Sequence, residues 1–432
     1  MTPQSTFMVV APLDPAREGD LRALLASMNT RPGVADPENA VVPFGRYDRL
    51  HFARFVILDD RTTRDITAYG VPAPEYPRYL AFLGDCDGPA REVLAELAEG
   101  AGDGLGRIFS HCHGYSRGAE LLRWMRAREH APAAAYTNWV GRTVRQIREE
   151  AALRDALESY LERAPELGAM EPREVRRALR RFVDQERAAG RLTLSPPDPT
   201  PLAWQLENAL RAVGLPLLVL AFGPLLLAYL PLFVLQLRRR EERDPVIAPR
   251  VDPEHLRKLS DQEDHEVTNQ FSAMGSLKPG LFRRWTVTAL LGFLDYTTRH
   301  IYTRGRLARV STIHFARWVF LDGKRRVLFA SSYDGSLESY MDDFINKVAF
   351  GLNLVFSNGV GYPSSDLLIF RGAKDEQKFK YFIRRHELAT EVWYNSHPGL
   401  TASDLEKNTR IREGLERPSM QDAEIREWMQ LL

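Results

Sequence analysis

An uncharged run near the middle of the chain limits what the chain can fold into. Residues 214–237 read GLPLLVLAFGPLLLAYLPLFVLQL. A helix rises about 1.5 Å per residue, so this run can reach across the roughly 30 Å apolar core of a bilayer. It is also too uniformly apolar for an ordinary surface helix, which keeps one polar face. The run therefore predicts association with a lipid membrane.

Prolines and arginines favour one mode of membrane association. Pro216, Pro224 and Pro231 interrupt the run. An interior proline kinks or breaks a helix, and two halves of about eleven residues are each too short to cross. Arginines stand on both sides of the run, although positive charge normally marks only the cytoplasmic end of a span. We therefore predict a kinked or re-entrant anchor in one leaflet, with a single crossing and a buried hairpin as alternatives. The residues expected at the membrane are Leu217, Phe222, Pro224, Leu227, Tyr229 and Phe233, followed by Arg238, Arg239 and Arg240.

Composition places further limits on the chain. Its 432 residues are enough for two or three domains. The net charge of +1 gives no electrostatic case for binding nucleic acid. The first residues, MTPQSTFMVVAPLDP, lack a basic segment followed by a long apolar core, so we expect no signal peptide and a location on the cytoplasmic face. Cys86 and Cys112 are then expected to be free thiols.

The first part of the chain alternates between strand and helix patterns in the order β-α-β-β-α-β. This order is typical of a ferredoxin-like unit. The expected strands cover residues 6–13, 50–58, 78–83 and 133–139, the expected helices cover 16–28, 89–98 and 143–163, and a turn is expected at 84–88.

Much of this pattern returns later in the chain. The segment LHFARFVILD at 50–59 returns as IHFARWVFLD at 313–322. Three further pairs follow in the same order: Asp87-Gly88 with Asp334-Gly335, Phe109-Ser110 with Phe356-Ser357, and Gly114-Tyr115 with Gly361-Tyr362. A collinear set of this kind indicates an internal duplication of residues 5–162 as 266–418.

The duplication predicts an α+β fold of two ferredoxin-like repeats. Each repeat leaves one sheet face bare, and two copies can bury these faces against each other. The expected result is a dimeric α+β barrel made within one chain. Its parts are a first repeat (1–162), a connector with the apolar segment (163–265) and a second repeat (266–432). A single membrane crossing would separate the repeats and forbid this pairing.

The connector contains an amphipathic stretch at 171–189. Its apolar face carries Val175, Leu179, Phe182 and Val183, and arginines cover much of the rest. Such a helix can lie on an anionic membrane surface, or it can pack on its own protein with the arginines in solvent. The sequence leaves both open. Residues 195–201, SPPDPTP, predict an extended linker.

Two arginines and two aspartates recur at matching positions of the repeats. Arg54 and Arg317 alternate with apolar residues, which predicts partial burial and a need for partners. They either form ion pairs within the fold, with Asp87 or Asp334, or bind an anionic group of a ligand. Asp87 and Asp334 precede expected helices and suit helix capping.

These residues resemble those of a known family. Gly84-Asp85-Cys86-Asp87-Gly88 matches the G-x-x-D-G motif of dye-decolourising peroxidases, which are duplicated ferredoxin-like proteins, and Ser331-Ser332-Tyr333-Asp334-Gly335 matches it apart from the first glycine. The resemblance implies a haem with an aspartate above it as acid–base, an arginine beside it and a histidine in the second half as iron ligand. Candidate catalytic residues are therefore Asp87, Asp334, Arg54 and Arg317, and candidate haem-binding residues are His397, His386 and His314. An apolar insert such as residues 214–237 is not expected in that family.

Two functions are consistent with this pattern. The first is a membrane-associated, haem-dependent oxidoreductase that acts on a hydrophobic or lipid-derived substrate. The second is a non-catalytic membrane-bound ligand-binding or scaffold module. The cluster Trp393-Tyr394-Asn395-Ser396-His397-Pro398 has no histidine in its first-half counterpart, which favours chemistry in the second half. The substrate and the oligomeric state are left open.

Overall fold

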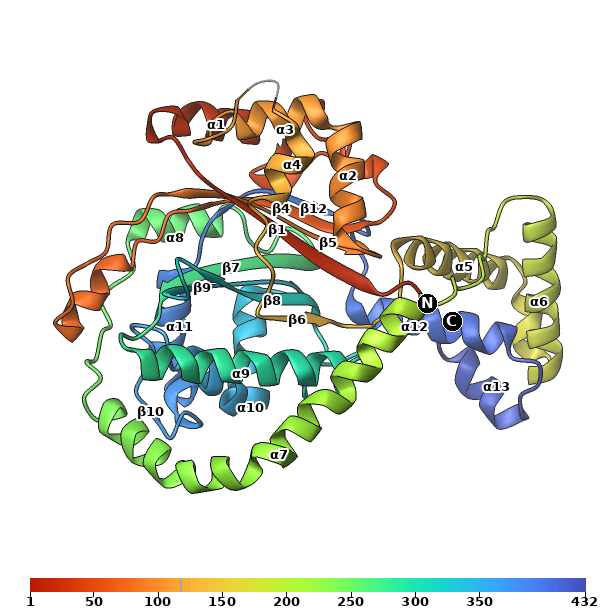
Figure 1. Ribbon diagram of the computed structural model, residues 1–432. Helices are drawn as coiled ribbons and strands as arrows, with labels where there is room; N and C mark the ends of the chain where they lie inside the picture. Colours follow the sequence, from red (N-terminus) through yellow and green to blue (C-terminus); the bar gives the residue numbers. More distant parts are fainter. Residues whose placement is uncertain (117–118) are drawn as a thin grey trace.

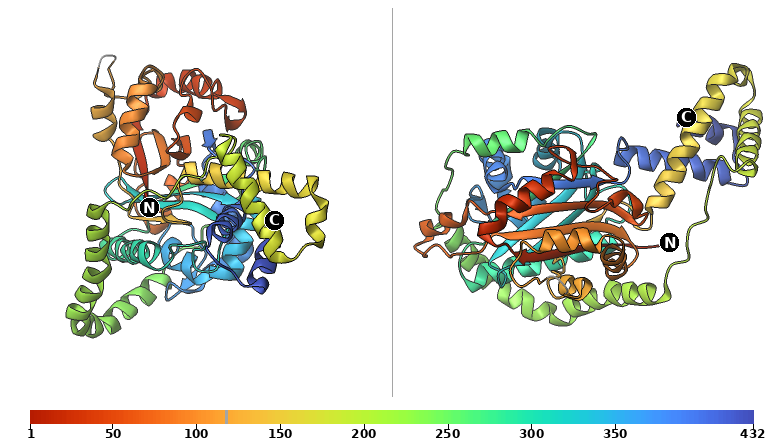
Figure 2. Two further views of the ribbon diagram at one scale, coloured as in Figure 1. Left: turned by 90° about the vertical axis from the view of Figure 1, so that its right-hand side faces the viewer. Right: turned by 90° about the horizontal axis from the view of Figure 1, so that it is seen from above.

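The protein is a mixed α+β structure with two large sheets at its centre (Figure 1). The computed structural model describes residues 1–116 and 119–432. Helices cover the outer side of each sheet, and a further group of helices projects from one end (Figures 1 and 2). The α+β fold class predicted from the sequence is confirmed.

The first sheet has the strand order β1-β5-β4-β12-β3-β2. All of its neighbours are antiparallel except the pair β12 and β3, which is parallel. Its strands are β1 (Gln4–Pro12), β2 (Asn29–Arg31), β3 (Gly33–Ala35), β4 (Leu50–Leu58), β5 (Tyr79–Asp87) and β12 (Thr390–Asn395).

The second sheet has the order β6-β8-β9-β7 and is antiparallel throughout. Its strands are β6 (Ala134–Thr137), β7 (Thr268–Ser276), β8 (Ile313–Leu321) and β9 (Arg326–Asp334). A two-stranded ribbon of β10 (Ser365–Asp366) and β11 (Phe370–Arg371) lies outside both sheets.

One strand of each half, β6 or β12, pairs with a strand of the other half. Glu129 first forms a bridge with Val9 of β1, and the chain then continues into β6, which pairs with β8. In the same way Glu387 forms a bridge with Ala273 of β7, and the chain continues into β12, which pairs with β4. Each sheet therefore takes a strand from the other half.

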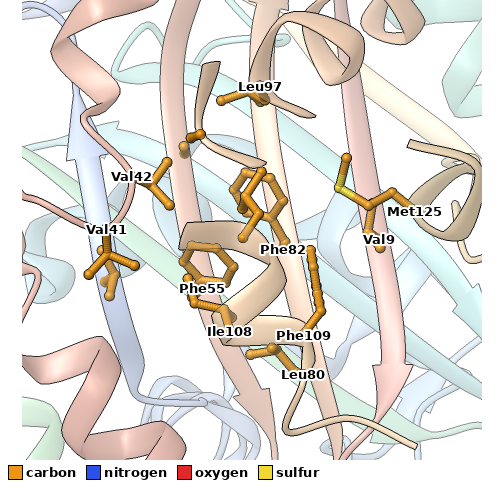
Figure 3. Close-up of a cluster of buried hydrophobic side chains, with 14 of the residues drawn as sticks. Val9, Val41, Val42, Phe55, Leu80, Phe82, Leu97, Ile108, Phe109 and Met125 are labelled. Atoms are coloured by element: carbon orange, nitrogen blue, oxygen red, sulfur yellow. The ribbon is translucent and has the colours of Figure 1, made fainter. Parts of the chain in front are cut away.

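Both faces of β4 are buried, which explains why all of its residues except His51 and Arg54 are apolar. Alternate side chains point to opposite faces of a strand. Phe55, with Phe82 of β5, faces the helices, and Val56 faces the second sheet. Figure 3 shows the helix-side cluster, where Phe55 and Phe82 lie beside Phe109. The helices over this face are α1 (Glu18–Ala26), α2 (Ala90–Gly100), α3 (Gly102–Phe109) and α4 (Leu121–Arg126).

The outer face of the second sheet is covered in a similar way. Trp318 and Phe329 pack against Leu291 of the first covering helix and Phe344 of the second. These helices are α9 (Leu281–His300) and α10 (Leu337–Phe356), with α11 (Glu376–His386) beside them. The short helix α8 (Pro253–Ser260) precedes β7.

The projecting helices form a core of their own. They are α5 (Val144–Arg163), α6 (Pro172–Ala188), α12 (Ala402–Glu416) and α13 (Asp422–Met429). Val175, Leu179 and Val183 of α6 are buried among the other three helices. The buried Arg176 donates to the carbonyl oxygen of Gly414 at 2.9 Å. The amphipathic stretch of the connector therefore packs on its own protein, and its apolar face is not free to bind a membrane.

The apolar run belongs to a single long helix, α7 (Leu202–Glu241). Its three prolines lie inside the helix and do not end it, so of the predicted kinked or re-entrant forms the structure has one continuous helix. The helix is bowed (Figure 1), as interior prolines lead one to expect. It contacts α9 near two points, where Tyr296 donates to the carbonyl oxygen of Ala212 at 3.0 Å and where the rings of Phe233 and Phe282 lie 5.2 Å apart.

Two smaller expectations have different outcomes. The turn predicted at 84–88 is wrong, because β5 continues to Asp87 and only Gly88 leaves the strand. The two cysteines are free and buried, as predicted. Burial raises the pKa of each thiol to about 12, so neither thiol is a reactive thiolate at neutral pH.

Candidate functional site

Two histidine–aspartate pairs lie at matching ends of the two sheets. His51 stands near the start of β4, and its Nε2 lies 2.9 Å from Oδ1 of Asp87, the last residue of β5. His314 and Asp334 occupy the same positions on β8 and β9, with the corresponding atoms 2.7 Å apart. All four side chains are buried, so each carboxylate fixes the orientation of its imidazole.

Each aspartate also binds the first backbone N–H of a helix. Oδ2 of Asp87 accepts from the N–H of Val144 in α5 at 2.8 Å, and Oδ2 of Asp334 accepts from the N–H of Ala402 in α12 at 2.7 Å. A carboxylate is favoured at a helix N-terminus by the helix dipole. Each aspartate was predicted to cap the helix that follows it, but it binds the start of a different helix, and α2 and α10 begin after Pro89 and Ser336 instead.

His397 lies between the two pairs. It follows β12, and its ring centroid is 6.2 Å from that of His51 and 5.7 Å from that of His314. Its Nδ1 lies 2.9 Å from Oγ of Ser396. Strand register places Trp139 at the matching position of the first half, because Tyr136 pairs with Ala316 as Tyr394 pairs with Ala53. The third histidine therefore breaks the correspondence of the two halves.

The three histidines line a small cavity of about 20 Å³. Within the described part of the chain, Nδ1 of His51 and Nε2 of His397 are buried without a hydrogen-bond partner. A cavity of this size has room for one water molecule. Arg142 also lines it, and burial lowers the pKa of this guanidinium to about 10. The cavity can thus hold one water molecule among polar side chains.

Electrostatics keep the central histidine neutral. Burial holds the pKa of His397 well below its usual range, and the neighbouring His314 and His51 lower it further. A neutral imidazole can accept a proton or bind a metal. No group of three or more histidine, cysteine or acidic side chains among residues 1–116 and 119–432 is arranged to hold a metal ion. Because the same surroundings disfavour the charged ring, His397 is a poor proton acceptor at neutral pH.

Arg54 and Arg317 lie between the sheets and do not line this cavity. Arg317 forms an ion pair with Asp85, while Arg54 donates to Oγ of Ser332 at 2.7 Å and to the carbonyl oxygen of Phe271 at 2.9 Å. Burial lowers the pKa of Arg54 to about 9, which leaves it charged at neutral pH. Both arginines are bound within the fold, but their partners are not the Asp87 and Asp334 considered from the sequence.

His386 occupies a separate place at the end of α11. Its Nδ1 lies 2.7 Å from the carbonyl oxygen of Phe382, and a Cβ added to Gly275 would come within 2.5 Å of its ring. Burial lowers its pKa. It lines a cavity of about 240 Å³ that neither Asp87 nor Asp334 reaches.

The residues predicted to bind haem do not fit one haem. Cavities for cofactors and drug-sized ligands measure roughly 300–1,000 Å³, whereas the cavity beside His314 and His397 measures about 20 Å³. Both carboxylate oxygens of Asp87 and of Asp334 already accept hydrogen bonds or bind an imidazole. His386 lies at the other cavity, without an aspartate. His386 is thus kept apart from both proposed acids, whereas His314 is bonded directly to Asp334, with no space for a haem between them.

The predicted membrane residues form an exposed apolar surface on α7. Its apolar part is not buried against the rest of the described structure. Leu220 and Leu227 are 75% and 70% exposed, and Leu217, Phe222, Leu225 and Tyr229 are exposed as well. Leu281, Trp285 and Phe293 extend this surface along α9. An apolar surface this large on a soluble monomer is unusual and marks an interaction site.

Three features of the site were not predicted from the sequence. The first is the burial of Asp85 between the sheets. Strand alternation could have predicted it, because Asp85 shares a face of β5 with Leu83. The other two are the position of Arg142 at the cavity and the contact of His51 with Asp87. Neither could be predicted from neighbouring residues, because the groups involved are distant in sequence.

Comparison with known proteins identifies no relative of this chain. No family model, curated protein or solved structure matches this chain. The resemblance to dye-decolourising peroxidases therefore rests on the G-x-x-D-G motif, whose aspartate here binds His51 and the start of α5.

Proposed function

We propose that this protein is a membrane-associated binding module that takes hydrophobic ligands from a bilayer. In this proposal α7 lies in one leaflet and holds the α+β body on the cytoplasmic face. The observation that carries the proposal is the exposure of the apolar part of α7. The absence of a shared haem site among the predicted residues favours this function over a peroxidase.

The distribution of apolar residues on α7 supports insertion into hydrocarbon. Neighbouring positions such as Leu217, Leu218, Val219 and Leu220 all lie more than half exposed, so the helix has no polar face in this part. An interfacial helix keeps a charged face toward water, and a helix that is apolar all round requires apolar surroundings. Lipid supplies these surroundings.

The contacts of α7 support a shallow position over a crossing. Ala212 and Phe233 both touch α9, so the helix is held to the body at both ends of residues 213–232. Arg238, Arg239 and Arg240 form its last turn and are exposed. Exposed arginines suit the anionic headgroup region on the cytoplasmic side.

We further propose that the two halves are related by duplication and close one barrel. In support, β4, β5 and β1 lie in the same order as β8, β9 and β7. Arg54 donates to the carbonyl oxygen of Phe271, and Arg317 donates to that of Phe7. The segments that lead into β6 and β12 bridge the two sheets at both edges, as a closed barrel requires.

Vesicle flotation tests the membrane proposal. The test variant carries Leu220→Glu and Leu227→Glu in the apolar part of α7. The matched control carries Leu202→Glu and Leu206→Glu. These leucines are also exposed, at 80% and 64%, but they lie in the first turns of α7, before its apolar part. We expect the wild type and the control to float with anionic vesicles and the test variant to stay in the soluble fraction. Equal flotation of both variants would overturn the proposal, and a stable soluble dimer of the wild type would assign the surface to self-association.

A further inference from the structure

A second apolar feature lies between α9 and α10. It is a cavity of about 370 Å³, within the range of pockets for small ligands. Apolar side chains from both helices and the sheet line it, among them Leu294, Trp318, Phe344, Leu352 and Val355. No lining residue in the described part of the chain is charged. The cavity therefore suits an uncharged hydrocarbon group.

The shape of α10 builds one wall of this cavity. Val348 lines the cavity, and its backbone leaves helical geometry there with φ −143° and ψ 28°, so the helix bends along the wall. Gly351 lines the same wall, and an added Cβ would meet no atom within 4 Å. The cavity can thus be filled from Gly351 without a clash.

Exposed apolar side chains lie at the edge of the cavity. Phe293, Ile301 and Phe350 line the cavity and are still 58%, 61% and 56% exposed. Phe293 belongs to α9, the helix that touches α7 at two points. If α7 lies in lipid as proposed, the cavity opens on the helix to which α7 is attached.

Basic residues flank the same edge of the cavity. Leu307 and Ala308 line the cavity, and Arg306 and Arg309 on either side of them are exposed. Arg211, by contrast, is paired with Glu207 at 2.8 Å. Neither Arg306 nor Arg309 forms an ion pair with any residue that the structure describes. Arginine binds carboxylate and phosphate oxygens well because its planar fork can donate two parallel hydrogen bonds.

We infer that this cavity binds one acyl chain and that Arg306 and Arg309 bind the anionic group at the head of that chain. The inference rests on the proposed membrane association and names the ligand class of that surface. The anionic group is either the carboxylate of a free fatty acid or the phosphate of a membrane lipid.

A photoreactive fatty acid tests the inference on the full-length protein. The protein is placed in phosphatidylcholine nanodiscs with a 16-carbon acid that carries a diazirine near the end of its chain, and crosslinked peptides are identified by mass spectrometry. We expect saturable labelling of α9 and α10 peptides that line the cavity. Gly351→Leu should reduce this labelling at least fivefold by filling the cavity, roughly the effect of losing the burial of one or two methylene groups. Gly292→Leu is the matched control, because Gly292 lies on α9, also has open space at its Cβ and does not line the cavity.

The head-group part is tested by competition. In the wild type, hexadecanoic acid should displace the probe about threefold better than hexadecanol, as expected for weak exposed ion pairs. The double variant Arg306→Ala and Arg309→Ala should lose this preference, while Arg257→Ala, an exposed arginine on α8, should keep it. Phosphatidylglycerol is then added to the nanodisc as a second competitor. If it displaces the probe to the same extent as hexadecanoic acid, the ligand is a membrane lipid. If only the acid displaces the probe, the ligand is a free fatty acid.

Labelling of α7 separates the two proposals. Label on α7 peptides without saturable label on the cavity would overturn the acyl-chain site and leave membrane association standing. Loss of α7 labelling would overturn membrane association itself. Equal cavity labelling in Gly351→Leu and Gly292→Leu would also contradict the site.

Discussion

Arg317 of β8 forms a buried ion pair with Asp85 of β5 and so joins the two sheets. At the corresponding place in the other half, Arg54 meets the neutral Ser332. Two arginines thus cross the interface in opposite directions, and only one of them has a carboxylate partner there.

Removal of Arg317 should destabilise the protein strongly. Arg317→Ala leaves Asp85 buried and unpaired, which typically costs about 3–5 kcal/mol in the free energy of unfolding. Urea unfolding measures this loss. The double variant Arg317→Ala and Asp85→Ala should lose clearly less than the sum of the two single variants, because it leaves no unpaired charge. The exposed Arg325 on the loop after β8 supplies a control, and Arg325→Ala should change stability by less than about 0.5 kcal/mol. Similar losses for Arg317→Ala and Arg325→Ala would contradict the role of the ion pair.

Ligand binding should respond to these arginines in a different way. Neither Arg54 nor Arg317 lines the cavity between α9 and α10 or the cavity of the three histidines. From the sequence these arginines could have bound an anionic group of a ligand directly. The structure instead predicts that any loss of binding in Arg54→Ala or Arg317→Ala follows its loss of stability.

His397 should make stability depend on pH below neutrality. Its pKa in the folded protein lies well below the unfolded value of about 6.5, because burial disfavours the charged ring. The unfolded chain therefore takes up a proton that the folded chain does not, and stability falls as pH drops below about 6.5. The contribution reaches about 1.4 kcal/mol per pH unit.

Urea unfolding at pH 7.5 and pH 5.5 checks this prediction. Other buried histidines, such as His255 and His386, act in the same direction, so the comparison is between variants. His397→Gln should lose less stability between the two pH values than the wild type does. His113→Gln, at an exposed position, should behave as the wild type. If His397→Gln keeps the full pH dependence, the histidine is not buried in its neutral form.

Replacement of the apolar part of α7 should give a folded and soluble protein. A Gly/Ser linker of about 12 residues can span up to roughly 40 Å, which exceeds the roughly 29 Å of helix formed by residues 214–232. Phe233 and the buried Leu237 are kept, because both pack on the body. Circular dichroism should show a melting temperature within a few degrees of that of the full chain. Aggregation or unfolding of this variant would show that the removed residues stabilise the core.

Both halves should lie on one side of the membrane. Since β12 pairs with β4 and β6 pairs with β8, neither sheet can form if a bilayer separates the halves. Protease protection with tags near residues 2 and 432 tests this in sealed, right-side-out vesicles. Both tags should be protected until the vesicles are opened. Removal of only one tag by external protease would mean that α7 crosses the bilayer.

Local patterns predicted many of the elements but few of their neighbours. The strand expected at 50–58 coincides with β4, and the helix expected at 143–163 nearly coincides with α5. Periodicity and capping residues specify a strand or a helix because they depend on nearby residues. The exchange of β6 and β12 depends on distant partners, and a strand pattern contains no information about which edge it joins.

The same limit explains the errors at the candidate site. The capping rule assigned Asp87 to the helix that follows it, but the N–H that it binds belongs to Val144, which lies 57 residues away. Proline rules predicted a kinked or re-entrant segment, and α7 remains one continuous helix that bends. The haem assignment stays a prediction, and spacing along the chain could not show that His386 lies at a cavity that neither aspartate lines.

The position of β12 has a consequence for synthesis of this chain on the ribosome. The edge of β4 that β12 covers becomes available early, but its partner is more than 300 residues further along, since Thr390 pairs with Val56. An unpaired apolar edge strand is prone to pair with other chains. The α7 segment leaves the ribosome during this interval, before any strand of the second sheet except β6. Early attachment of α7 to a surface would then keep neighbouring nascent chains apart until the last strand closes the first sheet.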